Sequence, residues 1–129
     1  MENQVLNKLS EAAAKAAKNS YSPYSGFAVG AAVLTENGKV YSGTNVENAS
    51  YGATMCAERV AIFKAVSEGE KKILALAVYT DAADYAYPCG MCLQVLSEFA
   101  EDIPVFVTGK AGTKTFKLSE LLPHRFDKR

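Results

Sequence analysis

The segment ILALAVYT, residues 73–80, constrains the fold of this chain more than any other stretch. It is a continuous run without the alternation of apolar and polar residues that a half-solvated strand shows. Strands of parallel or mixed sheets are covered on both faces and have this uninterrupted apolar character. The segment therefore predicts a buried strand in such a sheet, with other elements packed on either side.

The surrounding segments predict the elements that provide this cover. An alanine-rich start indicates one helix, and CAERVAIFKAVS indicates another that is so apolar around its circumference that we expect it to be buried. An Asn37-Gly38 turn between two apolar segments predicts a β-hairpin. The predicted helices cover 3–18, 56–67, a stretch ending at Glu98 and a turn at 119–123, and the further strands cover 26–35, 40–45, 103–109 and 113–118. Together they predict an α/β fold in three layers, a mixed five-stranded sheet with helices on both faces.

Length and charge restrict the classes of partner. With 129 residues and no linker-like segment, residues 1–129 are expected to form a single domain. Basic and acidic residues balance at 14 each, which disfavours nucleic acid as the main partner because phosphate binding needs a basic surface. A nucleoside has no phosphate and stays compatible. The start of the sequence lacks a secretory signal and no apolar run could span a bilayer, so we expect a cytoplasmic protein without membrane contact.

The three cysteines, Cys56, Cys89 and Cys92, are the clearest candidates for chemistry. In a reducing compartment this spacing indicates metal binding or catalysis more than a disulfide, and a redox pair would leave Cys56 unexplained. All three are expected at or just before helix N-termini, where N–H groups and the helix dipole stabilise a thiolate. A structural zinc site uses four protein ligands, whereas a catalytic site leaves one position for water. With no fourth cysteine and one histidine, His124, near the C-terminus, the ligand count favours an open zinc site.

Glu58 lies two residues after Cys56, in the most apolar predicted helix. An unpaired carboxylate is costly in such surroundings, but beside a metal-bound water it can move protons during hydrolysis. The alternative is an ordinary acidic residue in the first turn of a helix. Its combination with Cys56 and a distant Pro-Cys-x-x-Cys favours the catalytic interpretation.

The patterns CAE at 56–58 and PCGMC at 88–92 resemble the signature of the zinc-dependent nucleoside and nucleobase deaminases. The resemblance extends over nearly the whole chain. Within that group, the sequence is most similar to the small, homotetrameric cytidine deaminases. Five blocks match in the same order: YSPYSGFAVGAAVL (21–34), GTNVENASYG (43–52), CAERVAIFKAVSEG (56–69), VLSEF (95–99) and ELLPHRF (120–126). The resemblance implies the cytidine-deaminase-like fold and one Zn²⁺ per chain, held by Cys56, Cys89 and Cys92.

The implied activity is the hydrolytic deamination of cytidine and deoxycytidine to uridine and deoxyuridine plus ammonia, a reaction of pyrimidine salvage. In the implied mechanism a zinc-bound hydroxide attacks C4 of cytosine, while Glu58 delivers one proton to N3 and a second to the leaving amino group. No organic cofactor is implied. Three thiolates leave the zinc site with a net negative charge, and the resemblance implies that Arg59 offsets it through hydrogen bonds to cysteine sulfur. The alternative for Arg59 is an ordinary surface arginine.

The resemblance also implies how the nucleoside is bound. Phe27 corresponds to the aromatic residue that stacks on the base, although a core position is the commoner fate of a phenylalanine on a strand. Asn45 and Glu47 correspond to the residues that bind the ribose 3′-hydroxyl, which both donates and accepts hydrogen bonds. Tyr51 and Phe126 resemble residues that reach the site of a neighbouring subunit in a homotetramer.

Two positions depart from the family pattern. Leu93 follows the last cysteine where the family usually has an arginine, which removes a source of positive potential near the zinc site or at a subunit interface. Met55 precedes Cys56 where polar residues are frequent. Because the ligands remain, we expect zinc binding to be retained. The change at Leu93 bears on the electrostatics of the site and on subunit packing.

Three other functions are compatible with parts of the pattern. A deaminase of another aminated base would keep the zinc site and Glu58 but change the pocket, whereas FAVG and TNVEN favour cytidine and deoxycytidine. A non-enzymatic zinc module would need neither Glu58 nor an open coordination position. An RNA- or DNA-editing deaminase is disfavoured by the neutral charge and the lack of a basic patch.

Overall fold

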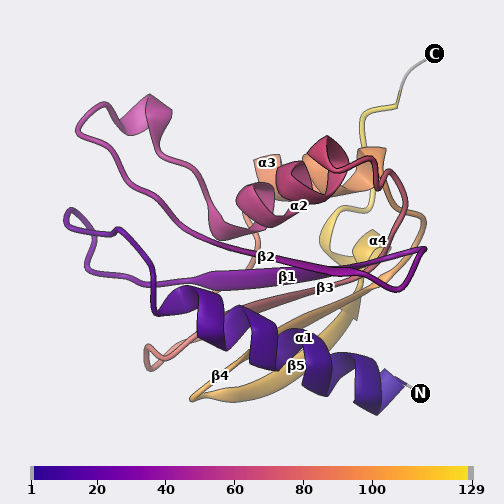
Figure 1. Ribbon diagram of the computed structural model, residues 1–129, viewed down its shortest axis with the longest axis horizontal. Coiled ribbons are helices and arrows are strands. Elements are labelled where there is room, and N and C mark those ends of the chain that lie inside the picture. The colour runs from indigo at the N-terminus through magenta and orange to yellow at the C-terminus, as the bar shows by residue number, and fades with distance from the viewer. Residues whose placement is uncertain (1, 128–129) are drawn as a thin grey trace.

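The computed structural model describes residues 2–127, which form one five-stranded sheet covered by helices on both faces (Figure 1). The elements are α1 (Glu2–Ala17), β1 (Gly30–Thr35), β2 (Val40–Thr44), the short 3-10 helix η1 (Tyr51–Ala53), α2 (Ala57–Ser67), β3 (Ile73–Thr80), α3 (Gly90–Glu98), β4 (Pro104–Gly109), β5 (Gly112–Lys117) and α4 (Leu118–Leu121). Among the helices of residues 2–127, none has the length and apolar character needed to cross a membrane.

The sheet is mixed, as the sequence predicts. Its strand order is β2-β1-β3-β4-β5, and β3 pairs antiparallel with β1 and parallel with β4. The outer pairs, β1 with β2 and β4 with β5, are antiparallel. A parallel pair needs a crossover connection, and α3 provides it between β3 and β4. Because of these directions, the start of β1 lies beside the ends of β2 and β3, at Gly30, Thr44 and Tyr79.

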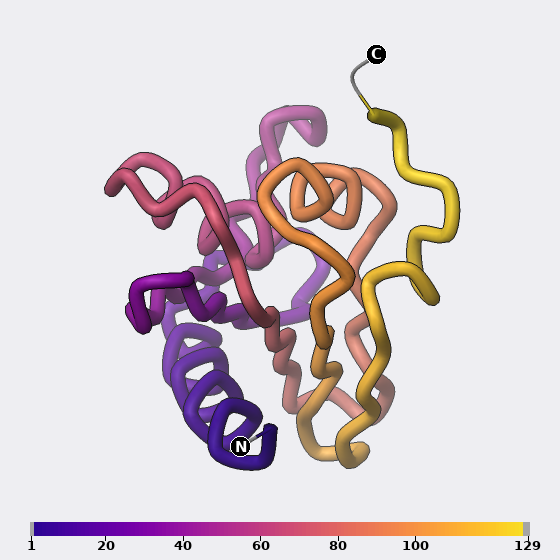
Figure 2. The backbone as a smooth tube through the Cα atoms, turned by 90° about the vertical axis from the view of Figure 1, so that its right-hand side faces the viewer, coloured from indigo at the N-terminus to yellow at the C-terminus, as the bar shows by residue number. Residues whose placement is uncertain are grey.

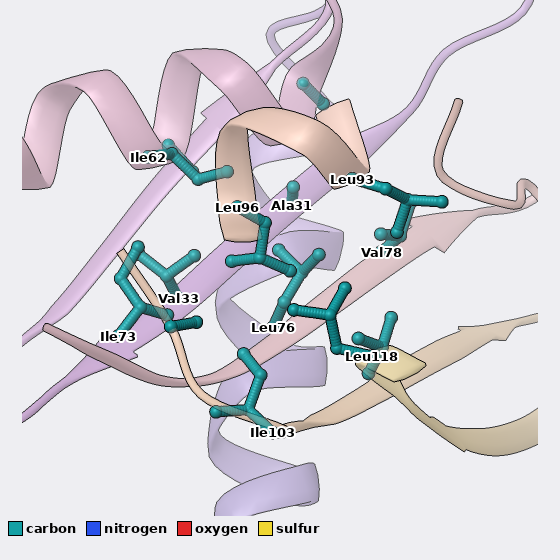
Figure 3. Packing of buried hydrophobic residues seen from close by; sticks show 14 of the residues in the cluster. Ala31, Val33, Ile62, Ile73, Leu76, Val78, Leu93, Leu96, Ile103 and Leu118 are labelled. Carbon is teal, nitrogen blue, oxygen red and sulfur yellow. The ribbon is translucent and has the colours of Figure 1, made fainter. Parts of the chain in front are cut away.

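The central strand β3 is covered on both faces, which confirms the prediction from its apolar run. Ala75 and Ala77 belong to a buried cluster with side chains of α1. Leu76 and Val78 belong to the larger cluster on the opposite face, where residues of α2 and α3 pack against them (Figure 3). Figure 2 shows the same arrangement from the side, with α1 on one side of the sheet and α3 on the other.

Helix α2 is buried within the chain on one side only, which differs from the expectation that it is covered all round. Ala57, Ala61 and Ile62 are buried in the main cluster. Phe63 on the outer side is 44% exposed. The reason is the layer architecture: the sheet and α3 cover the inner side of α2, and no further layer of the described chain lies outside it.

The predicted hairpin is present, but its first strand is shorter than expected. Residues 26–29 precede β1 as an irregular segment, and backbone groups of Phe27 and Val29 bond to the Asn45 side chain beyond the end of β2. Gly38 closes the turn with a positive φ of 80°, a conformation that glycine adopts without steric cost.

The segment after α4 lies along α3. The Gln94 side-chain amide donates to the carbonyl of Phe126 at 2.8 Å and its oxygen accepts from the N–H of Phe126 at 3.1 Å. Arg125 donates to the carbonyls of Ser97 and Ala100 at 3.0 and 3.2 Å, near the C-terminal end of the helix. These bonds hold the backbone of Phe126 in place while its side chain remains exposed.

Candidate active site

Three cysteines meet where α2 and α3 begin. Cys56 is the N-cap residue of α2 and Cys89 is the N-cap residue of α3, and Cys92 lies in the first turn of α3. The placement at helix N-termini therefore agrees with the sequence expectation. Exposed N–H groups and the positive end of the helix dipole favour thiolates at these positions.

The spacing of the three thiols fits one tetrahedral zinc ion. Zn–S bonds of about 2.3 Å place two sulfurs about 3.8 Å apart in this geometry. The Sγ atom of Cys89 lies 3.9 Å from Sγ of Cys56 and 3.4 Å from Sγ of Cys92. All three ligand atoms lie within 4.8 Å of one another, and no other His, Cys, Asp or Glu of residues 2–127 joins the group. The residues present thus supply three of four tetrahedral ligands.

Arg59 lies against this cluster. Its Nη2 donates to Sγ of Cys56 at 3.5 Å, and its Nε is buried without a hydrogen-bond partner among residues 2–127. Hydrogen bonds from Cys92 and then from Arg59 lower the pKa of Cys56 to about 5. The hydrogen bond between Cys56 and Cys92, together with burial, raises the pKa of Cys92. Of the pair Cys56 and Cys92, Cys56 is therefore the thiol that is more easily ionised.

Glu58 is buried beside the thiols, with 4% of its surface exposed. Burial raises its pKa to about 7, and the negative charge of Cys56 adds to the rise. A carboxyl group with a pKa near neutrality can both accept and release a proton at physiological pH. It lines the same cavity as Cys56 and Cys89, so the chain has a proton carrier next to its metal ligands.

This cavity has a volume of about 360 Å³ and its walls are mainly apolar, a size and character typical of sites for small molecules. Its walls contain Cys56, Glu58 and Cys89. Phe27, Asn45 and Glu47 line it as well. The structure therefore brings two of the predicted metal ligands, the predicted proton carrier and three of the predicted substrate contacts around one space, and Cys92 lies behind them, with its Sγ 3.4 Å from that of Cys89.

Asn45 is held in one orientation at the end of β2. Its Nδ2 donates to the carbonyl of Phe27 at 2.8 Å. Its Oδ1 accepts from the N–H of Val29 at 3.1 Å and from the hydroxyl of Ser20 at 2.6 Å. These bonds use one of its two N–H groups. The amide therefore fixes the segment that contains Phe27 and keeps one donor for a ligand.

Glu47 is held by the loop that precedes Phe27. Its Oε1 accepts from the backbone N–H groups of Tyr24 and Ser25 at 2.9 and 3.1 Å, and its Oε2 accepts from the hydroxyl of Ser25. The bond from that hydroxyl lowers the pKa of Glu47 below its ordinary value. The carboxylate therefore stays ionised and acts as an acceptor at the cavity wall.

Two predicted substrate contacts do not line this cavity. Tyr51 lies on η1 in an adjoining hollow with Tyr24, the two rings packing edge to face at 6.3 Å. Phe126 lies on the C-terminal segment beside α3. Both side chains are 78% exposed. Within one chain, neither is part of the site around the thiols.

Tyr85 and Tyr87 also line the cavity, and sequence reasoning did not single them out. Lys114 on β5 donates to the hydroxyl of Tyr87 at 3.1 Å, and its Nζ lies 4.7 Å from the centre of the Tyr85 ring. The position of Tyr87 directly before Pro-Cys-x-x-Cys is the one available signal. Nothing in the sequence links it to a lysine on a different strand.

The two positions that depart from the family pattern have different surroundings. Met55 lines the cavity, and its backbone exchanges hydrogen bonds of 3.0 and 2.9 Å with Val46. Leu93 is 6% exposed and belongs to the main hydrophobic cluster with Val78 and Leu96 (Figure 3). In this chain, the position after Cys92 therefore contributes to the core.

Comparison of the sequence with known protein families supports the zinc site described above. Residues 3–109 match the family described as "Cytidine and deoxycytidylate deaminase zinc-binding region". The chain belongs to this deaminase family. The matched segment includes all three cysteines and Glu58.

Relatives in the deaminase family are similar over nearly their full length. A cytidine deaminase of Sporosarcina psychrophila is 45% identical over 125 residues, which cover 95% of this chain and 92% of that protein. One of Halalkalibacterium halodurans is 45% identical over 128 residues, with coverage of 98% and 95%. The crystal structure of cytidine deaminase from Burkholderia pseudomallei superposes with a TM-score of 0.87 at 41% identity, covering 93% of this chain and 98% of that one. The cytidine-deaminase-like fold is thereby confirmed.

Proposed function

We propose that this chain is a zinc-dependent hydrolase that deaminates cytidine and deoxycytidine. The observation that supports this most is one cavity whose walls contain two thiols of the three-cysteine cluster, a buried carboxylate and an amide–carboxylate pair. The reaction consumes one water and gives uridine or deoxyuridine and one ammonia. Membership in the deaminase family supports the same activity.

Cys56, Cys89 and Cys92 would hold the zinc ion. When bound, zinc supplies Lewis acidity that lowers the pKa of water and so provides a nucleophile at neutral pH. Glu58 accepts the proton that water loses and delivers it to N3 of the cytosine ring. It then takes the proton of the hydroxyl group now on C4 and delivers it to the amino group, so that the C4–N bond breaks, ammonia leaves and C4 becomes a carbonyl. A pKa of about 7 suits both directions of transfer.

The remaining residues bind and orient the nucleoside. Phe27 provides the aromatic surface for the base, since its side chain lines the cavity. The free N–H of Asn45 and the carboxylate of Glu47 bind the ribose 3′-hydroxyl, one donating to it and the other accepting from it. Arg59 offsets the negative charge of the thiolates through its bond to Cys56.

The test is the ultraviolet absorbance of cytidine and of deoxycytidine incubated with purified protein, with zinc and ammonia quantified. We expect about one zinc per chain, loss of the cytidine spectrum and one ammonia released per uridine formed. Protein with full zinc that turned over neither nucleoside would contradict the proposal. It would favour a zinc-binding module without deaminase activity.

We also propose that residues 1–129 act as one domain of a cytoplasmic homotetramer, in which Tyr51 and Phe126 complete the site of a neighbouring subunit. The exposure of Tyr51 supports this, because its ring packs against the exposed ring of Tyr24 and the two form a contiguous apolar surface; Phe126 is equally exposed. Light scattering should give the mass of four chains, and a fully active monomer would contradict the assembly.

A further inference from the structure

Ser25 lies in the turn before β1 and connects two of the groups that face the cavity. The N–H of Gly26 bonds to the carbonyl of Ser22 at 2.9 Å, and Gly26 has a positive φ of 67°. This turn brings the hydroxyl of Ser25 back to the chain two residues on, where it accepts from the N–H of Phe27 at 3.0 Å. Such a local serine bond replaces a backbone partner for the N–H group.

The same serine binds the carboxylate of Glu47 with two groups. Its N–H donates to Oε1 at 3.1 Å and its hydroxyl donates to Oε2. A hydroxyl has one proton, and in this arrangement the proton is committed to Glu47. Ser25 therefore joins the backbone of Phe27 to the carboxylate of Glu47 across 22 residues of sequence.

These hydrogen bonds leave free donor and acceptor positions for a ligand. A carboxylate has about four acceptor positions, and Tyr24 and Ser25 fill three of those of Glu47. The unused position is on Oε2, the oxygen that the Ser25 hydroxyl holds. Among residues 2–127, Asn45 has one side-chain N–H without a partner. Together they offer one acceptor and one donor, the pair that a single sugar hydroxyl requires.

We propose that Ser25 is a positioning residue for substrate specificity: it aims the free acceptor of Glu47 at the 3′-hydroxyl of the nucleoside while it holds the backbone of Phe27. This inference rests on the proposed function and adds a residue to its sugar contact. Ser25 acts through Glu47 and touches none of the reacting atoms. Its loss should therefore weaken binding of substrates that have a 3′-hydroxyl and leave the chemical step unchanged.

The test compares Ser25→Ala with the wild type on two substrates, cytidine and 3′-deoxycytidine. Loss of a hydrogen bond to a charged group lowers the affinity for a ligand by about tenfold to hundredfold. We expect KM for cytidine to rise by this factor with kcat within about twofold. With 3′-deoxycytidine the substitution should have little effect, because the hydroxyl that Glu47 binds is absent.

Two further variants make the comparison specific. Ser25→Thr keeps the hydroxyl at an exposed position and should restore the KM for cytidine. Ser22→Ala removes another hydroxyl of the same loop. This hydroxyl accepts from Ser20 and bonds to neither Glu47 nor Phe27, so KM should stay unchanged. Zinc content and thermal stability are measured for every variant, so that a general disturbance of the loop is recognised.

The outcomes separate this inference from the proposed function. If the wild type prefers cytidine and Ser25→Ala keeps that preference in full, the positioning role is wrong. An equal loss on both substrates would also overturn it and assign Ser25 a structural role. If the wild type turned over both substrates equally well, the sugar contact itself would be wrong, and this inference with it. Lack of any turnover by the zinc-loaded wild type would contradict the proposed function.

Discussion

Glu58 shows at the residue scale how burial changes the chemistry of a side chain. It follows a zinc-ligand candidate by two residues, and its place in the first turn of α2 points it into the cavity lined by Cys56 and Cys89. Exclusion of water there raises its pKa to about 7, whereas an exposed glutamate stays ionised at that pH. The same residue type outside the cavity would not exchange protons at neutral pH.

Glu58→Gln is expected to keep zinc and lose turnover. The amide has nearly the same shape but cannot move a proton, and general acid–base catalysis contributes about 10²–10⁴ in rate. The measurement is kcat for cytidine together with zinc per chain. Glu68→Gln, at the exposed end of the same helix, is the matched control and should retain activity. Wild-type kcat in Glu58→Gln would remove Glu58 from the mechanism.

Leu93 lies next to the zinc ligand Cys92 in sequence, but its side chain contributes to the packing of the core. The family pattern places a cation after the last cysteine, but in this chain the side chain lies in the main cluster beside Val78 and Leu96. A hydrophobic side chain at this depth contributes roughly 1.5–3 kcal/mol by burial. The positive charge next to the thiols is therefore left to Arg59, which bonds to Cys56.

At the scale of elements, the close approach of α1 to the sheet depends on Gly30 at the start of β1. A Cβ atom built on Gly30 would lie 1.8 Å from the carbonyl oxygen of Ala13. No real side chain tolerates this distance, so α1 can pack here only above a glycine. The backbone of the helix therefore lies directly against the strand that begins next to the cavity wall.

Gly30→Ala is expected to lower the free energy of unfolding by at least about 2–3 kcal/mol, because the helix must move away from the sheet. Chemical denaturation measures this change. Gly52→Ala is the matched control, since a Cβ there meets no atom within 4 Å, and it should stay within about 0.5 kcal/mol of the wild type. Equal stability of the two variants would show that α1 does not need this contact.

The hydrogen bonds between the C-terminal segment and α3 can be tested by a substitution at Gln94. Gln94→Met removes both bonds to Phe126 while it keeps the length of the side chain. We expect amide hydrogen exchange of Phe126 to accelerate by about tenfold, the equivalent of one ordinary hydrogen bond. The amide of Leu122, bonded to Leu118 at 2.8 Å, is the internal control. Unchanged exchange at Phe126 would mean that other contacts hold the segment.

At the scale of the whole molecule, the metal site connects two helices that are distant in sequence. Cys56 and Cys89 are 33 residues apart, and each begins a different helix on the same face of the sheet. A metal held by both, together with Cys92, would tie α2 to α3. Metal binding to the folded state adds to its stability because the unfolded chain has no preformed site.

Removal of zinc with a chelator is therefore expected to lower Tm by more than about 5 °C. Differential scanning calorimetry before and after chelation measures the change. Restoring zinc should recover the original Tm, whereas magnesium should not, because thiolates are poor ligands for it. A Tm that is independent of zinc would argue against a metal link between α2 and α3.

Several features of the whole molecule were predictable because they depend on local patterns. The buried strand at 73–80 has the predicted bounds, since an uninterrupted apolar run directly reflects cover on two faces. The strand expected at 26–35 begins only at Gly30. Residues 26–29 are apolar like a strand, but their hydrogen bonds go to Asn45 and Thr80 and direct the chain into the cavity wall.

The sequence by itself determined the α/β class, the three candidate ligands and Glu58, because residue type, periodicity and short spacings suffice for these. The tertiary structure decided which distant groups meet: Ser25 with Glu47, Lys114 with Tyr87, and Gln94 with Phe126. These contacts depend on how loops and elements pack around the sheet. A pattern along the chain reports the surroundings of each residue but does not identify its partner.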